Sequence, residues 1–394
     1  MRNVLVSIGI LLVFSSCSVG TSDSNYSNTF PPSDVVLLDG PFKHARELNI
    51  QHLLKYDVDR LLAPYRKEAG LEPKAKSYEN WIGLDGHVGG HYLSAMAMNY
   101  ATTGNPECKE RMDYMLTELN ACQEANAQNY PEWGVGYVGG VPGSAEIWSA
   151  FQKGTLGPFR RSWVPWYNLH KMYAGLRDAW WYGKSEEAKS MFLKFCDWGI
   201  QITSGFSDEE MEAMLGTEHG GMNEVFADAY SISGDEKYLT AAKRFSHKFL
   251  LEPMSEGRDN LDNLHANTQV PKAVGFQRIA ELSGDDKYTK AGQFFWETVT
   301  QNRSLAFGGN SRREHFPAAS ACPKSWPCSV PPQANFSQGS WNTSWPKNGS
   351  ILSRPGGASN RPILKTPCGI MCSGRPCPRS ITPCNPLTAP SPTP

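Results

Sequence analysis

Acidic side chains are absent from the last fifth of this chain. Between Pro317 and Pro394 there is no Asp or Glu, although the 394-residue sequence holds 39 of them. The same stretch carries 16 of the 28 prolines and six of the ten cysteines, and it shows no helical or strand periodicity. A segment of this composition cannot bury enough apolar surface to fold by itself. We therefore expect a folded domain over residues 38–317 and a disordered or out-of-frame tail over residues 318–394.

A long apolar run is also missing, and one short run lies at the N-terminus. It extends from Val4 to Phe14 and is followed by Ser15-Ser16-Cys17. About ten apolar residues are too few to span a bilayer. Small residues directly before a cysteine resemble a bacterial lipoprotein signal, which predicts a signal peptide over residues 1–17, lipidation of Cys17 and a polar tether over 18–37. The alternative is a plain secretory signal cut nearby. Both interpretations predict export, to the periplasm or outer membrane of a bacterium, and the first predicts a membrane anchor.

Basic clusters with interleaved aromatics are lacking before the tail. The net charge is −1, and the tail contributes seven Lys and Arg with no acidic residue to balance them. The rest of the chain is therefore mildly acidic, and nucleic acid is not an expected partner.

Four helical hairpins are predicted between about residues 42 and 301. Their turns contain Gly104, Gly183, Gly234 and Gly284, which lie 79, 51 and 50 residues apart. Apolar residues fall at helical spacing on both sides of each turn, as Leu169, Met172, Tyr173 and Leu176 do before the second turn and Met191, Phe192 and Phe195 do after it. Glycine suits the left-handed position that ends the first helix of each pair.

These hairpins favour an all-α ring of paired helices. Units of about 50 residues with large aromatics on both helices fit a ring better than a flat solenoid of shorter repeats, which remains the alternative. A further helix is predicted from Phe42 to Tyr65.

Four histidines stand at matching places in the hairpins. His91, His170, His219 and His265 lie 13, 13, 15 and 19 residues before the turn glycines. If the first helices form the inner wall of a ring, these residues converge at one mouth. Each histidine taken alone is more often a helix cap or a satisfied buried residue, but four at matching positions favour a shared site.

The neighbours of these histidines suit a sugar. Trp166 can stack on the apolar face of a sugar ring, while histidine and Gln269 can bond its hydroxyls. A metal centre is the less favoured alternative, because no histidine pair here has zinc-motif spacing together with a carboxylate.

Five segments resemble the catalytic domain of glycoside hydrolase family 127 and its relative family 146, the β-L-arabinofuranosidase-like enzymes. They are GGHYLSAMAMNY, WYNLHKMYAGLRDAW, EHGGMNEVFADAY, HANTQVPKAVGF and GGNSRREHF, in this order, within about residues 38–316. The resemblance implies an all-α (α/α)6 barrel, followed in the family by β-sandwich domains. Since only four hairpins are clear here, we expect the ring to be incomplete at its C-terminal side, with exposed apolar wall. It also implies an exported enzyme that acts on plant-type, arabinose-containing oligo- or polysaccharides.

The resemblance also implies a mechanism and site residues. The family uses a retaining mechanism with an acid/base glutamate and a zinc-bound cysteine thiolate as nucleophile. Zinc keeps such a thiolate deprotonated at neutral pH. By resemblance, Glu314 is expected to be the acid/base residue. By the same resemblance, His170, His219 and His265 are expected to contact the sugar, with Gln269 as an alternative to His265. His91 and Asp85 are weaker candidates. On the simpler interpretation, Glu314 pairs with Arg312 or Arg313 in a surface loop.

The sequence departs from the family where the zinc ligands should stand. Neither the Glu-x-Cys motif nor the Cys-Cys pair of the family occurs here, and Cys322 and Cys328 have no neighbouring glutamate. The cysteines of the helical region, Cys108, Cys122 and Cys196, follow core patterns. Zinc therefore belongs to the intact family, and the residues present here support no metal site.

Three classes of function follow. The first is a β-L-arabinofuranosidase-like glycosidase, inactive in this form because its nucleophile is missing. The second is a sugar epimerase or polysaccharide lyase on the same ring, with histidines as acid and base. The third is a carbohydrate-binding remnant without chemistry.

The abrupt change in composition suggests a loss of reading frame between about Ala318 and Lys324. On this hypothesis the tail is out-of-frame translation, and another frame of the same DNA encodes a Glu-x-Cys motif followed by further helical pattern. Reading the gene downstream of the Ala318 codon in the other two frames tests this. If neither frame contains that motif, the hypothesis is wrong.

Overall fold

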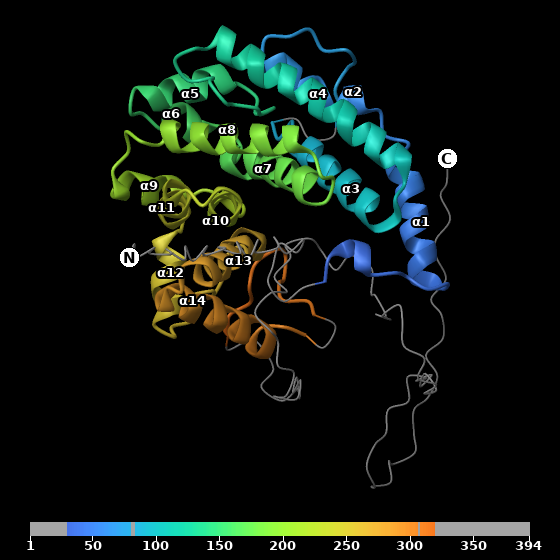
Figure 1. Cartoon of the computed structure of the whole chain (residues 1–394). Coiled ribbons are helices and arrows are strands. Elements are labelled where there is room, and N and C mark those ends of the chain that lie inside the picture. The colour runs from blue at the N-terminus through green and yellow to red at the C-terminus, as the bar shows by residue number, and fades with distance from the viewer. Residues whose placement is uncertain (1–29, 80–82, 306–307, 320–394) are drawn as a thin grey trace, which may run out of the picture. The chain divides into compact units, whose positions relative to one another are not determined.

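The computed structural model describes residues 30–79, 83–305 and 308–319, and these residues are almost entirely helical (Figure 1). The α-helices are α1 (Pro41–Leu53), α2 (Val58–Glu68), α3 (His87–Thr103), α4 (Pro106–Asn129), α5 (Ser144–Gln152), α6 (Gly157–Arg161), α7 (Pro165–Trp181), α8 (Glu186–Ile202), α9 (Asp208–Leu215), α10 (Met222–Ser233), α11 (Glu236–Arg244), α12 (Lys248–Ser255), α13 (Ala266–Ser283) and α14 (Asp286–Glu297). A 3-10 turn at Pro32–Asp34 and a π turn at Thr298–Asn302 complete the helical elements. Extended pairing in the described ranges is limited to isolated bridges that join His315 to His265 and to Arg312. The predicted all-α class is confirmed.

The four predicted hairpins are present as α3/α4, α7/α8, α10/α11 and α13/α14. Gly104, Gly234 and Gly284 each end the first helix in the left-handed conformation, which glycine adopts without steric cost. The residue after each of these three glycines then caps the second helix with its side chain, as Asp285 does for α14. Gly-Asn or Gly-Asp is thus the local signal that ends one helix and starts the next.

The second turn works differently from the prediction. At α7/α8 the left-handed residue is Lys184, with φ 57°, and not Gly183. A Cβ atom on Gly183 would lie 2.3 Å from the sulfur of Met112 in α4 and 2.5 Å from the backbone carbonyl oxygen of Ala179. Glycine is required at this position by close packing, because a side chain has no space there.

The helices form an inner and an outer set. The inner helices α7, α10 and α13 are buried over most of their length, and the contacts between elements place α7 between α3 and α10, with α13 on the other side of α10. The outer partners α4, α8, α11 and α14 bury one face each, and Figure 1 shows α7 beside α8 and α13 beside α14. The wide spacing of 79 residues between the first two turn glycines accommodates α5 and α6.

Glycines bring α3 and α7 into backbone contact. A Cβ atom on Gly90 would lie 2.1 Å from the carbonyl oxygen of Lys171, and one on Gly175 would lie 2.7 Å from the carbonyl oxygen of Gly90. Real Cβ atoms do not approach backbone atoms so closely, so both positions require glycine. This contact fixes the distance of α3 from the rest of the inner wall.

A buried ion-pair network ties the other inner helices together. Asp228 of α10 accepts hydrogen bonds from Arg177 Nη1 of α7 at 2.6 Å and from Arg278 Nε of α13 at 2.7 Å. All three side chains are buried. Removing one partner of such a network leaves an uncompensated buried charge, at a cost of about 3–5 kcal/mol.

The prediction of one continuous helix from Phe42 to Tyr65 is wrong, because two helices, α1 and α2, occupy this range. The chain leaves the helical path after Leu53, and Asp57 starts a new helix by accepting a hydrogen bond from the backbone N–H of Asp59 at 3.0 Å. A capping aspartate inside an apolar pattern therefore divides one predicted helix into α1 and α2.

None of the helices in the described ranges is long and apolar enough to cross a membrane. The predicted signal peptide, Cys17 and most of the tether and tail lie outside these ranges.

Substitution of Gly90 by alanine tests the close contact of α3 and α7. Helix propensity alone would make alanine about 1 kcal/mol more favourable within α3. Because its Cβ would overlap backbone atoms of α7, we expect Gly90→Ala instead to lower the free energy of unfolding by about 3 kcal/mol. Chemical denaturation measures the change.

The matched control is Gly205→Ala, since a Cβ atom there meets nothing within 4 Å. It should change the free energy of unfolding by less than about 0.5 kcal/mol. A Gly90→Ala protein as stable as the wild type would contradict the close-contact interpretation.

Candidate functional site

Polar side chains gather at the N-terminal ends of the inner helices. His170 lies in the second turn of α7, His219 in the loop before α10, and His265 at the N-cap of α13. His91 lies in the second turn of α3 and is exposed, with its ring edge-on to that of His87 at 6.3 Å between centroids. Burial lowers the pKa of His170 most, and electrostatic coupling to Lys171, Arg177, His91 and His219 lowers it further, so these side chains lie near one another. The structure thus brings these histidines to one end of the inner wall.

Two glycines allow the loop before α10 to lie against His170. A Cβ atom on Gly220 would be 2.6 Å from His170 Nδ1, and one on Gly221 would be 2.9 Å from His170 Nε2. Gly220 also has φ 58°, in the left-handed region. The sequence Glu-His-Gly-Gly is therefore explained by its geometry, because any side chain at either glycine would push the buried imidazole away.

The hydrogen-bond partners of the two buried histidines fix their tautomers. His219 Nδ1 lies 2.9 Å from the carbonyl oxygen of Thr217, which can only accept, so Nδ1 carries the proton. Its Nε2 is then an acceptor, and this buried atom has no hydrogen-bond partner in the part of the chain that the structure describes. His170 Nδ1 faces the ammonium of Lys171 at 3.4 Å and accepts, so its buried Nε2, also without a partner, is an N–H donor.

Both imidazoles are neutral. Burial lowers the pKa of His170 and of His219 well below the usual histidine value, and nearby cations lower both further. The base of the cluster therefore contains one uncharged acceptor and one uncharged donor, both buried and without a hydrogen-bond partner among the described residues.

A buried lysine stands behind His219. Lys272 of α13 is 1% exposed, and its Nζ lies 2.8 Å from His247 Nδ1 and 3.1 Å from Gln269 Oε1. Burial lowers its pKa to about 8, against the charges of Glu212 and Glu218, which favour the charged form. Gln269, predicted from sequence, is buried beside this lysine.

The exposed rim of the cluster carries charge. Glu218 accepts a hydrogen bond from Asn267 Nδ2 at 3.0 Å. Burial raises the pKa of Glu218, while the charges of His265, Lys171 and Lys272 act in the opposite direction. Lys171 lies over the ring of Tyr167, 4.2 Å from its centroid, and burial lowers the pKa of Lys171 to about 8.

Glu314 lies at the edge of this rim. Its backbone carbonyl accepts from the N–H of Ala266 at 2.7 Å, and its carboxylate lies 3.4 Å from His265 Nε2. Glu314 and the preceding Arg313 both have positive φ, at 67° and 50°, which is uncommon outside glycine and marks a constrained turn. Among the described residues, His265 is the side chain that contacts the Glu314 carboxylate, and the exposure of Glu314 agrees with the surface-loop position of the simpler interpretation. The carboxylate is 81% exposed and open to a ligand.

The predicted stacking role of Trp166 is corrected by its position. Trp166 is fully buried, donates a hydrogen bond from Nε1 to the sulfur of Met214 at 3.2 Å, and packs against Trp148, Trp198 and Phe245. No face of this ring is open to a sugar, so Trp166 belongs to the aromatic core.

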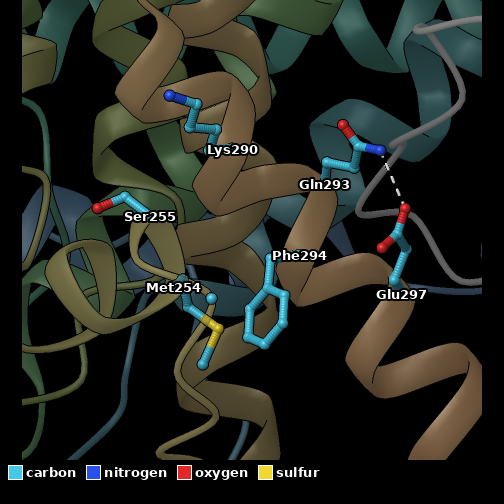
Figure 2. A pocket seen from close by; sticks show the side chains of 7 residues that line it. Met254, Ser255, Lys290, Gln293, Phe294 and Glu297 are labelled. Carbon is cyan, nitrogen blue, oxygen red and sulfur yellow. Dashed lines mark hydrogen bonds between the residues drawn. The ribbon is translucent and has the colours of Figure 1, made fainter.

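A separate hollow of about 240 Å³ lies between α12 and α14 (Figure 2). It is lined by Met254, Ser255, Gly257, Lys290, Gln293, Phe294 and Glu297. Gln293 donates to Glu297 at 2.9 Å along α14. The hollow shares no residue with the histidine cluster and is not part of the candidate site.

The sequence and the fold of the chain both match known proteins. The sequence profile of the β-L-arabinofuranosidase GH127 catalytic domain matches residues 34–328. The chain belongs to the GH127 family.

Solved structures of GH127 enzymes have a similar fold. A GH127 β-L-arabinofuranosidase from Geobacillus stearothermophilus T6 matches with a TM-score of 0.52 at 15% sequence identity, over 71% of this chain and 47% of that one. A second GH127 β-arabinofuranosidase matches with a TM-score of 0.47 at 15% identity, over 70% of this chain and 44% of its own. This chain spans less than half the length of either structure. No curated protein sequence matches it. The fold is the (α/α) barrel of the GH127 family, as predicted.

The described residues of this GH127 chain do not fit the zinc ion implied by the family. Within the described ranges, no group of three or more His, Cys, Asp and Glu side chains is placed to hold a metal ion. Cys108, Cys122 and Cys196 are buried in α4 and α8, and burial raises the pKa of each, that of Cys122 to about 12. These cysteines are core thiols. Cys322 and Cys328 lie outside the described residues.

Several residues of the cluster escaped the sequence analysis. Lys272 follows Gln269 by three residues on α13, one helical turn, and this spacing could have identified it. Glu224 lies next to the glycine pair, and its pKa is raised to about 7 by burial, opposed by Arg177. His247 directly precedes the connecting helix α12. Because this helix is not part of a repeated hairpin, the repeat pattern does not identify His247.

The lowered pKa of Lys272 predicts how stability depends on pH. Between its folded pKa of about 8 and the usual value of 10.5, the unfolded state binds more protons at this group. Its contribution to the free energy of unfolding therefore rises with pH through this window. We expect the free energy of unfolding of the wild type, relative to Lys272→Met, to rise by about 2 kcal/mol between about pH 7.5 and about pH 10.

Denaturation curves across this pH range provide the measurement. Lys243→Met is the control, because Lys243 is partly exposed and pairs with Asp285 on the outer surface. Its difference from the wild type should stay nearly constant with pH. Parallel profiles for the wild type and Lys272→Met would show that the ammonium is not destabilised by burial.

Proposed function

We propose that this GH127 domain binds the terminal arabinofuranosyl unit of a plant-type glycan, with Glu314 as the acid/base residue of a β-L-arabinofuranosidase-like site. The observation that carries the proposal is the pair of neutral histidines at the base of the cluster, one a buried donor and one a buried acceptor without partners. A sugar hydroxyl can both donate and accept, so adjacent hydroxyls satisfy this pair. The residues proposed to contact the sugar are His91, His170, His219, His265 and Gln269.

The charge distribution favours a neutral sugar over an acidic one. His170 and His219 are uncharged, and the ammonium of Lys272 is already engaged by His247 and Gln269. A polysaccharide lyase that binds a uronate would require cations directed at the ligand. The lyase alternative therefore has less support than a glycosidase-type site.

Glu314 is suited to proton transfer at the rim. A general acid must reach the glycosidic oxygen of the leaving group, and the exposed carboxylate beside His265 faces solvent, where a leaving group departs. The retaining mechanism implied by the family also needs a nucleophile, and the cysteines of the described ranges are buried thiols. We therefore propose that this chain recognises the sugar but does not complete hydrolysis, which makes a non-catalytic binding role the second candidate.

Binding and cleavage together test these proposals. We expect the full chain to bind methyl β-L-arabinofuranoside in calorimetry, and His219→Leu, which removes the buried acceptor, to weaken binding about tenfold or more. The control His52→Leu, on the exposed surface of α1, should bind like the wild type. We expect no cleavage of an aryl β-L-arabinofuranoside by this chain with added zinc, and cleavage by a frame-restored version.

In the restored version, Glu314→Gln should slow cleavage about 10²–10⁴-fold for a sugar leaving group and less for an aryl one, which needs little protonation. Equal cleavage by the chain as it stands would disprove the non-catalytic role. Binding of uronic acid oligosaccharides in place of arabinofuranosides would support a lyase.

We also propose export as a lipoprotein, on the pattern that ends at Cys17. Fatty-acid labelling that persists in a Cys17→Ser variant would rule out this anchor.

A further inference from the structure

Gln269 ends a chain of polar contacts whose other three members, Glu212, His247 and Lys272, the proposed function does not use. Glu212 belongs to α9, His247 caps α12, and Lys272 and Gln269 lie on α13. The consecutive distances are 3.3 Å from Glu212 Oε1 to His247 Nε2, 2.8 Å from His247 Nδ1 to Lys272 Nζ, and 3.1 Å from Lys272 Nζ to Gln269 Oε1. We call these four residues the relay.

Glu212, which can only accept, and Lys272, which can only donate, determine which atom donates in each contact of the relay. The carboxylate of Glu212 accepts the backbone N–H groups of Lys248 and Phe249 at 2.9 and 2.8 Å, at the start of α12. An ammonium has donors and no acceptor, so His247 Nδ1 must accept from Lys272. The single proton of the neutral imidazole is then on Nε2 and points to Glu212.

The same rule fixes the amide of Gln269. Oxygen and nitrogen of a carboxamide are assigned from their partners. Because Lys272 can only donate, the Gln269 atom that faces it must be Oε1. The NH2 group is then turned the other way, toward the carbonyl oxygen of His265, from which Nε2 lies 3.5 Å. At this length the contact leaves the NH2 group available to another acceptor.

We infer that Lys272 is a positioning residue that turns the Gln269 carboxamide so that its NH2 group, and not its oxygen, faces the bound sugar. Gln269 then donates to an oxygen atom of the arabinofuranoside, next to the His265–Glu314 pair. His247 and Glu212 hold Lys272 in this role. The inference rests on the proposed sugar-binding function, and it adds a specificity for an acceptor atom at this point of the ligand.

Two variants separate the amide from the lysine. Gln269→Glu keeps an oxygen for Lys272 but removes the NH2 donor, so binding of methyl β-L-arabinofuranoside should weaken about tenfold or more. Lys272→Met frees the amide to rotate, and we expect a smaller loss, about threefold to tenfold. Lys290→Met, which removes a lysine from the hollow in Figure 2, is the matched control and should bind like the wild type. If Lys272→Met does not fold by circular dichroism, Gln269→Glu alone decides.

A ligand-free readout tests the polarity of the relay directly. In ¹⁵N spectra of histidine-labelled protein, the signals lost in His247→Gln should be those of a neutral imidazole protonated at Nε2. An Nδ1-protonated tautomer, or undiminished binding by both Gln269→Glu and Lys272→Met, would overturn the inference. Absence of binding by the wild type itself would refute the proposed function, while the tautomer would still decide the direction of the relay.

Discussion

The inner wall of this protein depends on one buried carboxylate, that of Asp228. It accepts hydrogen bonds from arginines on both neighbouring helices, Arg177 of α7 and Arg278 of α13. Because a buried charge is tolerated only when paired, this contact sets the register of three helices. His170 lies seven residues before Arg177, and Gln269 nine residues before Arg278, so both stand about two helical turns or more from the network, at the same ends of their helices. The ion pairs thus determine which side chains meet at the candidate site.

The inner helices determine which groups of the candidate site carry a charge. Its base is deeply buried, and burial next to Lys171, Lys272 and Arg177 disfavours any further positive charge, so His170 and His219 stay neutral. Neutral imidazoles have distinct donor and acceptor nitrogens, whereas protonated ones only donate. The cations therefore help to keep both histidines neutral, so that each has one donor nitrogen and one acceptor nitrogen. The charged groups that can contact a ligand lie at the rim and are Glu218, Lys171 and Glu314.

The sequence predicted what has a local cause. Helix hairpins could be found because a left-handed glycine and a capping residue act within a few positions, as at Gly284-Asp285. Trp166 was misassigned because a residue that faces the core and one that faces a cavity have the same helical spacing. Gly183 was assigned to the wrong cause, since contact with Met112 depends on a distant helix. His247 reaches the site through packing of a connecting helix, which no local pattern encodes.

Recognition and bond cleavage place different demands on this fold. Recognition needs neutral groups at fixed angles, and the backbone provides them through the Gly220-Gly221 contact with His170, the Thr217 carbonyl at His219 and the turn that holds Glu314. Cleavage with retention needs in addition an ionised nucleophile, and burial acts against ionisation at Cys108, Cys122 and Cys196 by raising their pKa. The interior that keeps the histidines neutral is thus unsuited to a thiolate without a compensating cation. In this family fold, a nucleophile therefore requires its own charge partner, separate from the helices that bind the sugar.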